Sequence, residues 1–432
     1  MAGMGVSKVS GTPQTGKPTK VRIAIMGIMF LTVLIAFLDR VNVSIIIADP
    51  AFKSEMHLMN NPTAQGFLMS FFLFTYALGN IFFGPIGDWL GPRKTVLISI
   101  FSWSISVIMG AVARTLNLLY ASRLLLGTVE ALHYPMMSKY VRNWTPPREW
   151  GKANAAWALG IWAGPTVALP LVAWVVKVWG WRASYWVCAA IGFAVLPLVW
   201  WTTDRPEQHK RVNKAELDYI QSGNEQVQGQ QKGIPKRFWA NTKVLLTNPD
   251  YILNMLSYWG STVMFWGLVA WLPAYLKQAR GFSWMAMGWM SSLPFIFGAV
   301  GTILCGTISD KTGPRRAPYF AIGMVGSTSF LYLGATVQGN MTAALCMAMA
   351  MFFIGFNIPP AFTIVQKIAH SELVGTAVGL QNGSSQFVGA FVPMMVGYVI
   401  ATTGSYLSGL MFMVVAGALG ACCATALSIR KI

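Results

Sequence analysis

The chain has 432 residues, of which 55% are hydrophobic and only 11% are charged, and its formal net charge is +18. Because soluble domains carry about 25% charged residues, this composition excludes an ordinary soluble domain and predicts a protein that crosses a membrane many times. The basic balance does not indicate nucleic-acid binding. Most of the 32 Lys and Arg fall in segments that we place on one side of the membrane, which is the asymmetry expected of cytoplasmic loops.

Twelve apolar segments of roughly membrane-spanning length follow one another along the chain. They are predicted at residues 22–48, 64–87, 94–113, 117–141, 151–177, 182–202, 250–277, 284–309, 318–337, 341–366, 373–401 and 406–429. We therefore predict an all-α membrane protein with two six-helix halves, residues 22–202 and 250–432, joined by a polar cytoplasmic linker at 203–249. Residues 1–21 are expected to form a disordered cytoplasmic tail, with both termini in the cytoplasm and the spans in the inner membrane.

The first apolar segment contains two opposite charges within a stretch that is long enough to cross the bilayer. Ile23 to Leu38 are uncharged, Asp39 and Arg40 follow, and apolar residues resume at Val41. Each charge inside a membrane helix costs at least roughly 2.5–3.5 kcal/mol, and such residues usually mark an ion or substrate path. The alternative is a helix that ends at Leu38, with both charges at the lipid surface.

The fourth apolar segment contains a second pair of opposite charges, Arg123 and Glu130. Their separation is almost two helical turns, which places both on one face about 10 Å apart. Together with Asp39 and Arg40 they form a set with no net charge. A carboxylate bound to one arginine would leave one acid without its partner, and that acid would then favour uptake of a proton. This is a physical route to coupled anion and proton transport; the alternative is a static network of buried ion pairs.

His133 and Tyr134 follow Glu130 by one helical turn. Glu130 and His133 have the i, i+3 spacing of a metal-ligand pair, but no further ligand accompanies them, so we expect His133 and Tyr134 to line a cavity as hydrogen-bonding groups. The five cysteines lie in apolar segments without metal spacing, and no nucleophile–base pair is apparent. We therefore predict neither an enzyme nor a metal or cofactor site, with the proton as the coupling ion.

One loop motif, Gly-x-x-x-Asp-x-x-Gly-Pro-Arg-[Lys/Arg], occurs once in each predicted half. The first copy contains Asp88 and Arg93, and the second, 222 residues later, contains Asp310 and Arg315. Internal symmetry between halves is typical of secondary transporters, and the motif's second glycine permits a tight turn before its proline. Chance similarity of two loops is the alternative.

This repeated motif resembles the loop signature of the major facilitator superfamily. The resemblance covers the whole chain, through the twelve spans, the long central loop and the motif in each half. It implies alternating access between two halves. It also implies that Asp88 and Arg93, and with them Asp310 and Arg315, act as a conformational latch rather than as a substrate site.

Two segments resemble one branch of that superfamily, the anion:cation symporters, which include permeases for galactonate and other sugar acids, phthalate and tartrate. These segments are Phe-Leu-Asp-Arg-Val-Asn at 37–42 and Arg-Leu-Leu-Leu-Gly-Thr-Val-Glu-Ala-Leu-His-Tyr-Pro at 123–135. The resemblance implies that Asp39 and Glu130 take up protons and that Arg123 pairs with Asp39. It further implies that the substrate is held by Arg40, Tyr76 and Asn382.

Two positions depart from the sugar-acid permeases of that branch. Phe37 stands where a tyrosine lines the site, and Trp162 stands where a glutamine binds the ligand. Both changes remove hydrogen-bonding groups, which favours a smaller or more apolar carboxylate, aromatic acids included. Trp157 and Trp266 would add aromatic surface near the cavity; alternatively, the three tryptophans pack against lipid or other helices.

We therefore predict a monomeric, proton-coupled secondary transporter that imports a small organic anion, a sugar acid or another carboxylate, across a lipid bilayer. Nucleic acid is not an expected partner. The complete set of predicted substrate-binding residues is Arg40, Tyr76, His133, Tyr134, Trp162, Gln381 and Asn382. The alternatives are a facilitator antiporter that exports amphipathic compounds, and a non-transporting membrane sensor or enzyme on the same fold.

Three local patterns give further structural expectations. Gly160 and Gly164 suit a close helix contact or a kink. The segment 357–360, Asn-Ile-Pro-Pro, is expected to break the tenth span. Asn213 followed by Glu216 resembles the capping box at the start of a helix.

Overall fold

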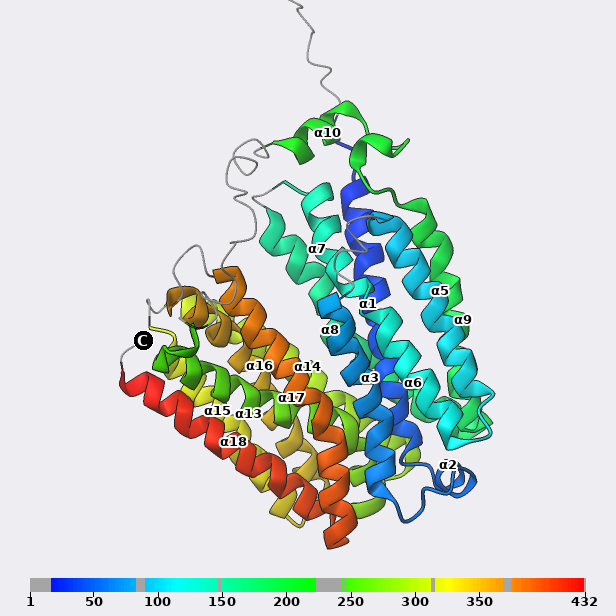
Figure 1. Ribbon diagram of the computed structural model, residues 1–432, viewed down its shortest axis with the longest axis vertical. Coiled ribbons are helices and arrows are strands. Elements are labelled where there is room, and N and C mark those ends of the chain that lie inside the picture. Colours follow the sequence, from blue (N-terminus) through cyan, green and yellow to red (C-terminus); the bar gives the residue numbers. More distant parts are fainter. Residues whose placement is uncertain are drawn as a thin grey trace, which may run out of the picture.

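The computed structural model describes residues 17–82, 90–146, 149–222, 243, 245–311, 315–368 and 374–430. Throughout these residues the secondary structure is helical, and no strand occurs among them. Figure 1 shows the helices gathered into two groups side by side, one built from the first part of the chain and one from the second. The all-α fold is therefore confirmed.

The first group begins near the start of the described chain and ends in the linker. Its members are α1 (Val21–Ile46), α2 (Pro50–Glu55), α3 (Pro62–Phe82), α5 (Pro92–Ala111), α6 (Leu116–Glu130), α7 (His133–Trp144), α8 (Trp150–Trp179) and α9 (Trp181–Trp201). The short helices η2 (Pro206–Gln208) and α10 (Lys214–Gln221) belong to the linker. We call the two ends of the molecule the α2 end and the α10 end (Figure 1).

The second group contains the remaining helices of the described chain. They are α13 (Pro249–Ala274), the π-helical turn η3 (Tyr275–Ala279), α14 (Trp284–Lys311), α15 (Ala317–Thr336), α16 (Asn340–Ile368), α17 (Val374–Thr403) and α18 (Tyr406–Ile429). In order, the helices of both groups match the twelve predicted spans to within a few residues. Eight of the described helices are individually long and apolar enough to cross a membrane.

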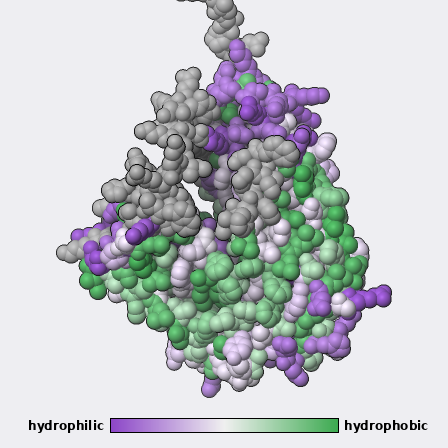
Figure 2. Space-filling model, viewed as in Figure 1, coloured by the Kyte–Doolittle hydropathy of each residue, from purple (hydrophilic) through white to green (hydrophobic). Residues whose placement is uncertain are grey.

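The surface of the molecule has the pattern of a membrane protein. Figure 2 shows hydrophobic residues over the middle of the visible face, with hydrophilic residues gathered at the α10 end and around the opposite end. Large apolar side chains are well exposed, among them Trp200 at 67% and Leu419 at 65%. In water such a surface would be unfavourable, whereas lipid chains cover it without loss.

Two prolines differ in what they do to their helices. Pro135 lacks an N–H and clashes with the carbonyl four residues earlier, and the fourth span accordingly divides into α6 and α7 at Ala131. The expectation of a break at Pro359 was wrong, since α16 runs unbroken from Asn340 to Ile368. The Gly355 carbonyl, which Pro359 deprives of its helical partner, accepts a hydrogen bond from Thr302 Oγ1 of α14 at 3.0 Å. A neighbouring helix thus supplies the missing donor.

The predicted glycine contact is confirmed between α1 and α8. A β-carbon on Gly160 would lie 3.0 Å from the Phe30 carbonyl oxygen, and one on Gly164 would lie 2.5 Å from Cβ of Phe37. The second distance is shorter than real β-carbons show and the first is tighter than most, so a larger residue at either position would push the helices apart. The contact fixes α1, which carries Asp39 and Arg40, against α8.

The linker is attached to the first group of helices through α10. Asn213 caps α10 as expected, accepting a hydrogen bond from the backbone N–H of Glu216 at 2.9 Å. Glu216, however, turns to α1, where its buried carboxylate accepts from the backbone N–H groups of Val21 at 3.2 Å and Arg22 at 3.1 Å. It thereby caps the N-terminus of the helix that holds the charged residues. Thr19, from the predicted tail, also donates to this carboxylate.

The two groups of helices meet at the α2 end. The backbone N–H of Met394 in α17 donates to Ser70 Oγ of α3 at 3.1 Å, and a β-carbon on Gly66 would lie 2.3 Å from the Pro393 carbonyl oxygen. Gln278 of η3 donates to the carbonyl of Ile47 at 3.3 Å. Figure 1 shows α3 and α17 converging toward this end.

Candidate functional site

Arg40 and Glu130 form a buried ion pair inside the first group of helices. Arg40 Nε of α1 donates to Glu130 Oε2 of α6 at 2.8 Å, and their side chains are 4% and 0% exposed. Glu130 Oε1 has no hydrogen-bond partner among the described residues. Because α1 continues to Ile46 with both Asp39 and Arg40 buried, the alternative in which the helix ends at Leu38 is excluded.

Three aromatic rings surround the Arg40 guanidinium. Its carbon lies 4.4 Å from the ring centre of Tyr76, 4.5 Å from that of Phe37 and 5.3 Å from that of Phe72. Such rings attract a cation electrostatically and hold its plane in a fixed orientation. The ion pair with Glu130 engages Nε, whereas the two terminal nitrogens are the fork that suits a carboxylate. The structure thus brings Tyr76 to Arg40, as predicted.

Arg123 does not pair with the Asp39 carboxylate, which corrects the pairing that the resemblance implied. Its Nε donates to the Leu68 carbonyl at 3.0 Å and its Nη1 to the backbone carbonyl of Asp39 at 3.4 Å. Both Asp39 carboxylate oxygens and Arg123 Nη2 lack a hydrogen-bond partner among the described residues. The four charged residues therefore lie together, but the ion pair that forms among them is Arg40 with Glu130 and not the expected Arg123 with Asp39.

Helix geometry explains why Asp39 is left without a pair. Adjacent residues on an α-helix point about 100° apart, so the same turn of α1 cannot aim both side chains at one neighbour. Arg40 faces Tyr76 of α3 and Glu130 of α6, and Asp39 faces α9, where the Cys188 thiol lies beside its carboxylate. Cys188, which we read from the sequence as a packing residue, is thus next to a buried acid.

His133 and Tyr134 occupy different surroundings, although they are adjacent in sequence. The His133 ring packs edge-on against Trp103 of α5, with centroids 5.4 Å apart, and is 2% exposed. Tyr134 packs edge-on against Trp157 at 5.0 Å and interacts electrostatically with Arg40, Tyr76 and Tyr258 of α13. The structure therefore places Tyr134 at the site. His133 also interacts electrostatically with Arg40, and its Nε2 has no hydrogen-bond partner among the described residues, so its role in lining a cavity stays a prediction.

Gln381 and Asn382 are likewise separated by the turn of their helix, α17. Gln381 is fully buried; its Oε1 accepts from Asn254 Nδ2 at 2.7 Å, and its Nε2 donates to the Ala361 carbonyl at 3.5 Å. Its amide is occupied by α13 and α16, which corrects the expectation that it faces a ligand. Asn382 is exposed, so its amide is free to meet one.

The tryptophans fill space between helices. Trp162 of α8 is 8% exposed and lies against α14, where a β-carbon on Gly298 would be 2.2 Å from the indole ring. Trp266 of α13 lies in the same way against Gly389 of α17, at 2.5 Å. The structure therefore gives both indoles the packing role that we held as the alternative, with Trp162 placed where the two groups of helices meet.

The loop motif is described only in part. Arg93 donates from its backbone N–H to Asp204 Oδ1 at 2.8 Å and from Nη2 to the Trp200 carbonyl at 2.5 Å, and its guanidinium lies 4.7 Å from a ring centre of Trp200. The first copy's residue Asp88 and the side chain of Asp310 lie outside the described residues, and Arg315 is exposed. The latch remains a prediction.

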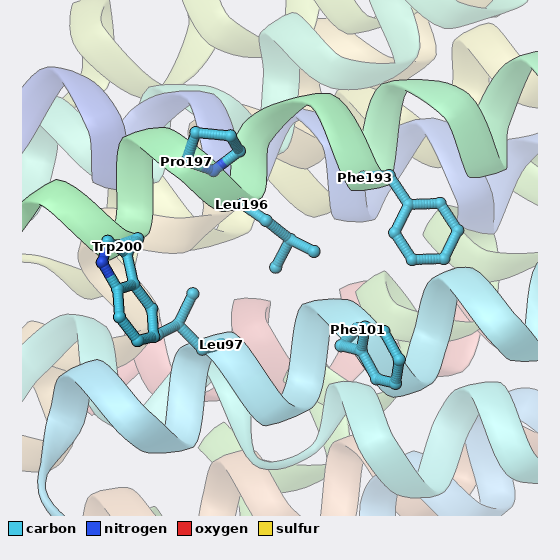
Figure 3. Close-up of a pocket in the computed structure, with 6 residues that line it drawn as sticks. All are labelled: Leu97, Phe101, Phe193, Leu196, Pro197 and Trp200. Atoms are coloured by element: carbon cyan, nitrogen blue, oxygen red, sulfur yellow. The ribbon is translucent and has the colours of Figure 1, made fainter.

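Tyr258 is a site residue that sequence reasoning did not single out. It belongs to the second group of helices and interacts electrostatically with Tyr134 of the first, and the sequence offers only a tyrosine in an otherwise apolar span as a signal. An apolar groove of about 600 Å³ between α5 and α9 is a different feature (Figure 3). It is lined by Leu97, Phe101, Phe193, Leu196, Pro197 and Trp200, without a charged side chain, and suits lipid chains rather than an ion.

Sequence comparisons place the chain among transporters. It is 30% identical to the protein named "Probable galactarate/D-glucarate transporter" in Bacillus subtilis, over 94% of this chain and 91% of that one. It is 29% identical to the "Probable sulfoacetate transporter" of Cupriavidus necator, over 93% and 92%. It is also 28% identical to a D-galactonate transporter of Escherichia coli, over 89% and 90%.

Solved structures agree on the fold. A bacterial homolog of the human lysosomal transporter Spinster superposes with a TM-score of 0.76 at 16% identity, covering 96% of this chain and 98% of that one. A D-xylose-proton symporter gives 0.71 at 15% identity, covering 94% and 97%. The family model described as Major Facilitator Superfamily matches residues 29–393 of this chain. These matches confirm the resemblance, and the chain belongs to the major facilitator superfamily of membrane transport proteins.

Proposed function

We propose that the protein is a secondary transporter that carries a small organic anion across the membrane together with a proton. One observation carries the proposal: a buried cation, Arg40, is held by a single acid, Glu130, beside a second buried acid, Asp39, that has no hydrogen-bond partner among the described residues. Relatives named for sugar acids and sulfoacetate support an anionic substrate.

The mechanism follows from exchange of partners at Arg40. In this proposal a substrate carboxylate replaces Glu130 as the counter-ion of Arg40, and the displaced acid gains a proton because a buried carboxylate without a counter-ion is costly. Release of the anion on the other side reverses both steps. In the proposed cycle Tyr76 and Tyr134 line the approach to Arg40, and Tyr258 and the exposed Asn382 contribute to the site from the other half.

The direction of opening follows from where the halves touch. We assign the α10 end to the cytoplasm on the asymmetry of Lys and Arg, which puts both described chain ends on that side and the α2 end outside. The contacts of α3 with α17 then close the outer side in this conformation. In the proposed cycle, the anion and proton enter when this contact separates, and they leave toward the cytoplasm. We place the protein in the inner membrane and take the monomer as the working unit.

The surroundings of Arg40 favour a small acid. Phe37 gives the site an apolar wall where a tyrosine hydroxyl would otherwise serve a polyhydroxy acid, and its ring already stacks on Arg40. The six-membered ring of the Trp162 indole packs against Gly298 of α14 and adds apolar surface. Short carboxylates and sulfonates match these limits better than long sugar acids.

Uptake into proteoliposomes with an imposed pH gradient tests the proposal. Wild type is expected to accumulate at least one member of a panel of galactonate, glucarate, sulfoacetate and benzoate when the outside is acidic. Glu130→Gln is expected to lose this pH-driven accumulation but to keep exchange of labelled for unlabelled anion. The matched control is Glu149→Gln, an acid at the start of α8 that is 31% exposed. Undiminished proton-driven uptake by Glu130→Gln, or export in exchange for protons, would contradict the proposal.

A further inference from the structure

A second cavity lies between the two groups of helices at the α2 end, apart from the charged site. Its volume is about 320 Å³, within the lower range of small-ligand sites. One wall comes from α2, α3 and the loop between them, through Lys53, Met59, Asn60, Pro62 and Gln65. The other wall comes from η3, the end of α17, the turn after it and the start of α18, through Gln278, Ile400, Ala401, Gly404 and Tyr406.

Lys53 is the one charged side chain among the residues that line this cavity. It is only 7% exposed, and no ion pair or hydrogen bond engages its ammonium within the described chain. The nearby acid, Asp49, accepts from the backbone N–H of Ala51 at 3.1 Å and so caps α2. Burial lowers the pKa of Lys53 below its usual range, and Asp49 only partly offsets this. An amine in these surroundings gains from a negatively charged neighbour.

Neutral polar groups complete the lining. Gln278 accepts at Oε1 from the Tyr406 hydroxyl at 2.6 Å, and its Nε2 reaches backbone carbonyls only at 3.3 and 3.5 Å. Gln65 is 2% exposed and donates to the Leu58 carbonyl, while its Oε1 has no partner among the described residues. Asn60 adds a further exposed amide. The lining therefore offers one positive charge, several N–H donors and an acceptor for a ligand hydroxyl.

We infer that this cavity is an accessory binding site for a small organic monoanion, a carboxylate with or without a hydroxyl group, and that its occupancy holds the outer end closed. The choice of ligand class rests on the proposed function, because the same anions would approach the protein from this side. The single lysine sets the charge, and the amides and the free Gln65 oxygen fit a carboxylate and an adjacent hydroxyl.

The effect on closure follows from the two walls. Lys53 and Gln65 belong to the first group of helices, and Gln278 and Tyr406 belong to the second. When the outer end opens, these walls separate, and a bound anion loses the contacts of one of them. An anion that binds the closed state more tightly shifts the population toward that state.

The test measures conformation and binding rather than transport. Spin labels are placed at Ser54 of α2 and Thr402 of α17, both exposed and outside the cavity lining, after replacement of the native cysteines. Label separation and thermal unfolding are followed in nanodiscs as sodium acetate or sodium gluconate replaces sodium chloride at constant ionic strength. Both anions are expected to favour the shorter separation and raise the unfolding temperature.

Three variants assign the effect to this cavity. In Lys53→Met, the anion concentration that gives half of the response is expected to rise about tenfold, the loss typical of one charge-assisted contact. Lys53→Arg is expected to keep the wild-type response. Lys177→Met removes an exposed lysine near the same end, in the last turn of α8, and serves as the control with an unchanged response.

A fourth variant separates this site from the charged one. Arg40→Gln combined with Glu130→Gln keeps the charge balance while removing the proposed transport site, and the anion response at the outer end is expected to persist. Loss of the response in this variant with retention in Lys53→Met would overturn the inference, as would the absence of any anion response in wild type. If none of the four anions is taken up in the proteoliposome assay, the proposed function is contradicted. The anion response in label separation and unfolding temperature would still test the accessory site separately.

Discussion

The two halves of the molecule bury polar groups in different ways. The first half buries charges: Arg40 pairs with Glu130, while Asp39 and Arg123 lie nearby without a shared ion pair. The second half buries amides: Asn254 donates to Gln381 at 2.7 Å and to the Ala361 carbonyl at 3.0 Å. Charges change with protonation and amides do not. In the proposed cycle the first half is therefore the one that responds to protons.

The largest expected effect comes from breaking the charged pair. Arg40→Met leaves Glu130 buried without its partner, which should cost about 3–5 kcal/mol of stability and abolish anion uptake. Thermal unfolding of the purified protein measures the first effect and proteoliposome uptake the second. Adding Glu130→Gln should restore much of the stability but not the uptake. Equal stability of Arg40→Met and wild type would show that the pair does not exist.

The next effect distinguishes neighbours on α17. Gln381→Leu removes an acceptor from buried Asn254 and should cost about 1–3 kcal/mol, while the KM for the anion stays within about twofold of wild type, a difference of under about 0.5 kcal/mol in binding. Asn382→Leu should do the opposite, raising KM with little loss of stability. A KM defect in Gln381→Leu without a fall in unfolding temperature would mean that its amide meets the substrate after all.

A smaller effect is expected at the helix caps that begin the two halves, at the N-termini of α1 and α13. Glu216 caps α1 with a charged group, whereas Asn248 caps α13 with a neutral amide that accepts from Asp250 at 2.9 Å. Glu216→Gln should cost about 1 kcal/mol, in the range of a lost helix cap and its charge, and increase protease cleavage of the linker. Asn248→Ala should cost a similar amount without changing that cleavage. Equal cleavage in both variants would argue against the role of Glu216 in holding α10 to the start of α1.

The smallest effect concerns an exposed pair in the first half. Arg182 Nη1 lies 2.6 Å from Glu55 Oε2, and this hydrogen bond lowers the pKa of Glu55 below its usual range. A lowered pKa means that the stabilisation is present above the ordinary glutamate value and is lost as the pH falls through the lowered one. Because Glu55 is exposed, Glu55→Gln should cost at most about 0.5 kcal/mol. Unfolding temperatures at pH 7 and pH 4 should differ less in the variant than in wild type.

The residue types of the sequence predicted which charged residues are buried in the membrane. They did not predict which partners the side chains of these residues contact. Charges inside an apolar stretch identify Asp39, Arg40, Arg123 and Glu130, because burying them has a known cost. Their partners depend on rotations of one helix against others, which no spacing rule contains. The same limit explains Gln381, whose amide is taken up by α13 and α16 although its neighbour Asn382 is exposed.

The sequence by itself determined the membrane class, the twelve spans, the superfamily and the four buried charges, since hydropathy, helix length and motif spacing are local properties. The tertiary structure alone decided that Arg40 rather than Arg123 forms the ion pair and that Glu216 reaches back to α1. It also decided that a lysine-lined cavity lies between α2 and the turn before α18. Each of these three features brings together residues that are far apart in the chain. The distance between such residues in space is set only when glycine contacts and proline bends fix how the helices pack.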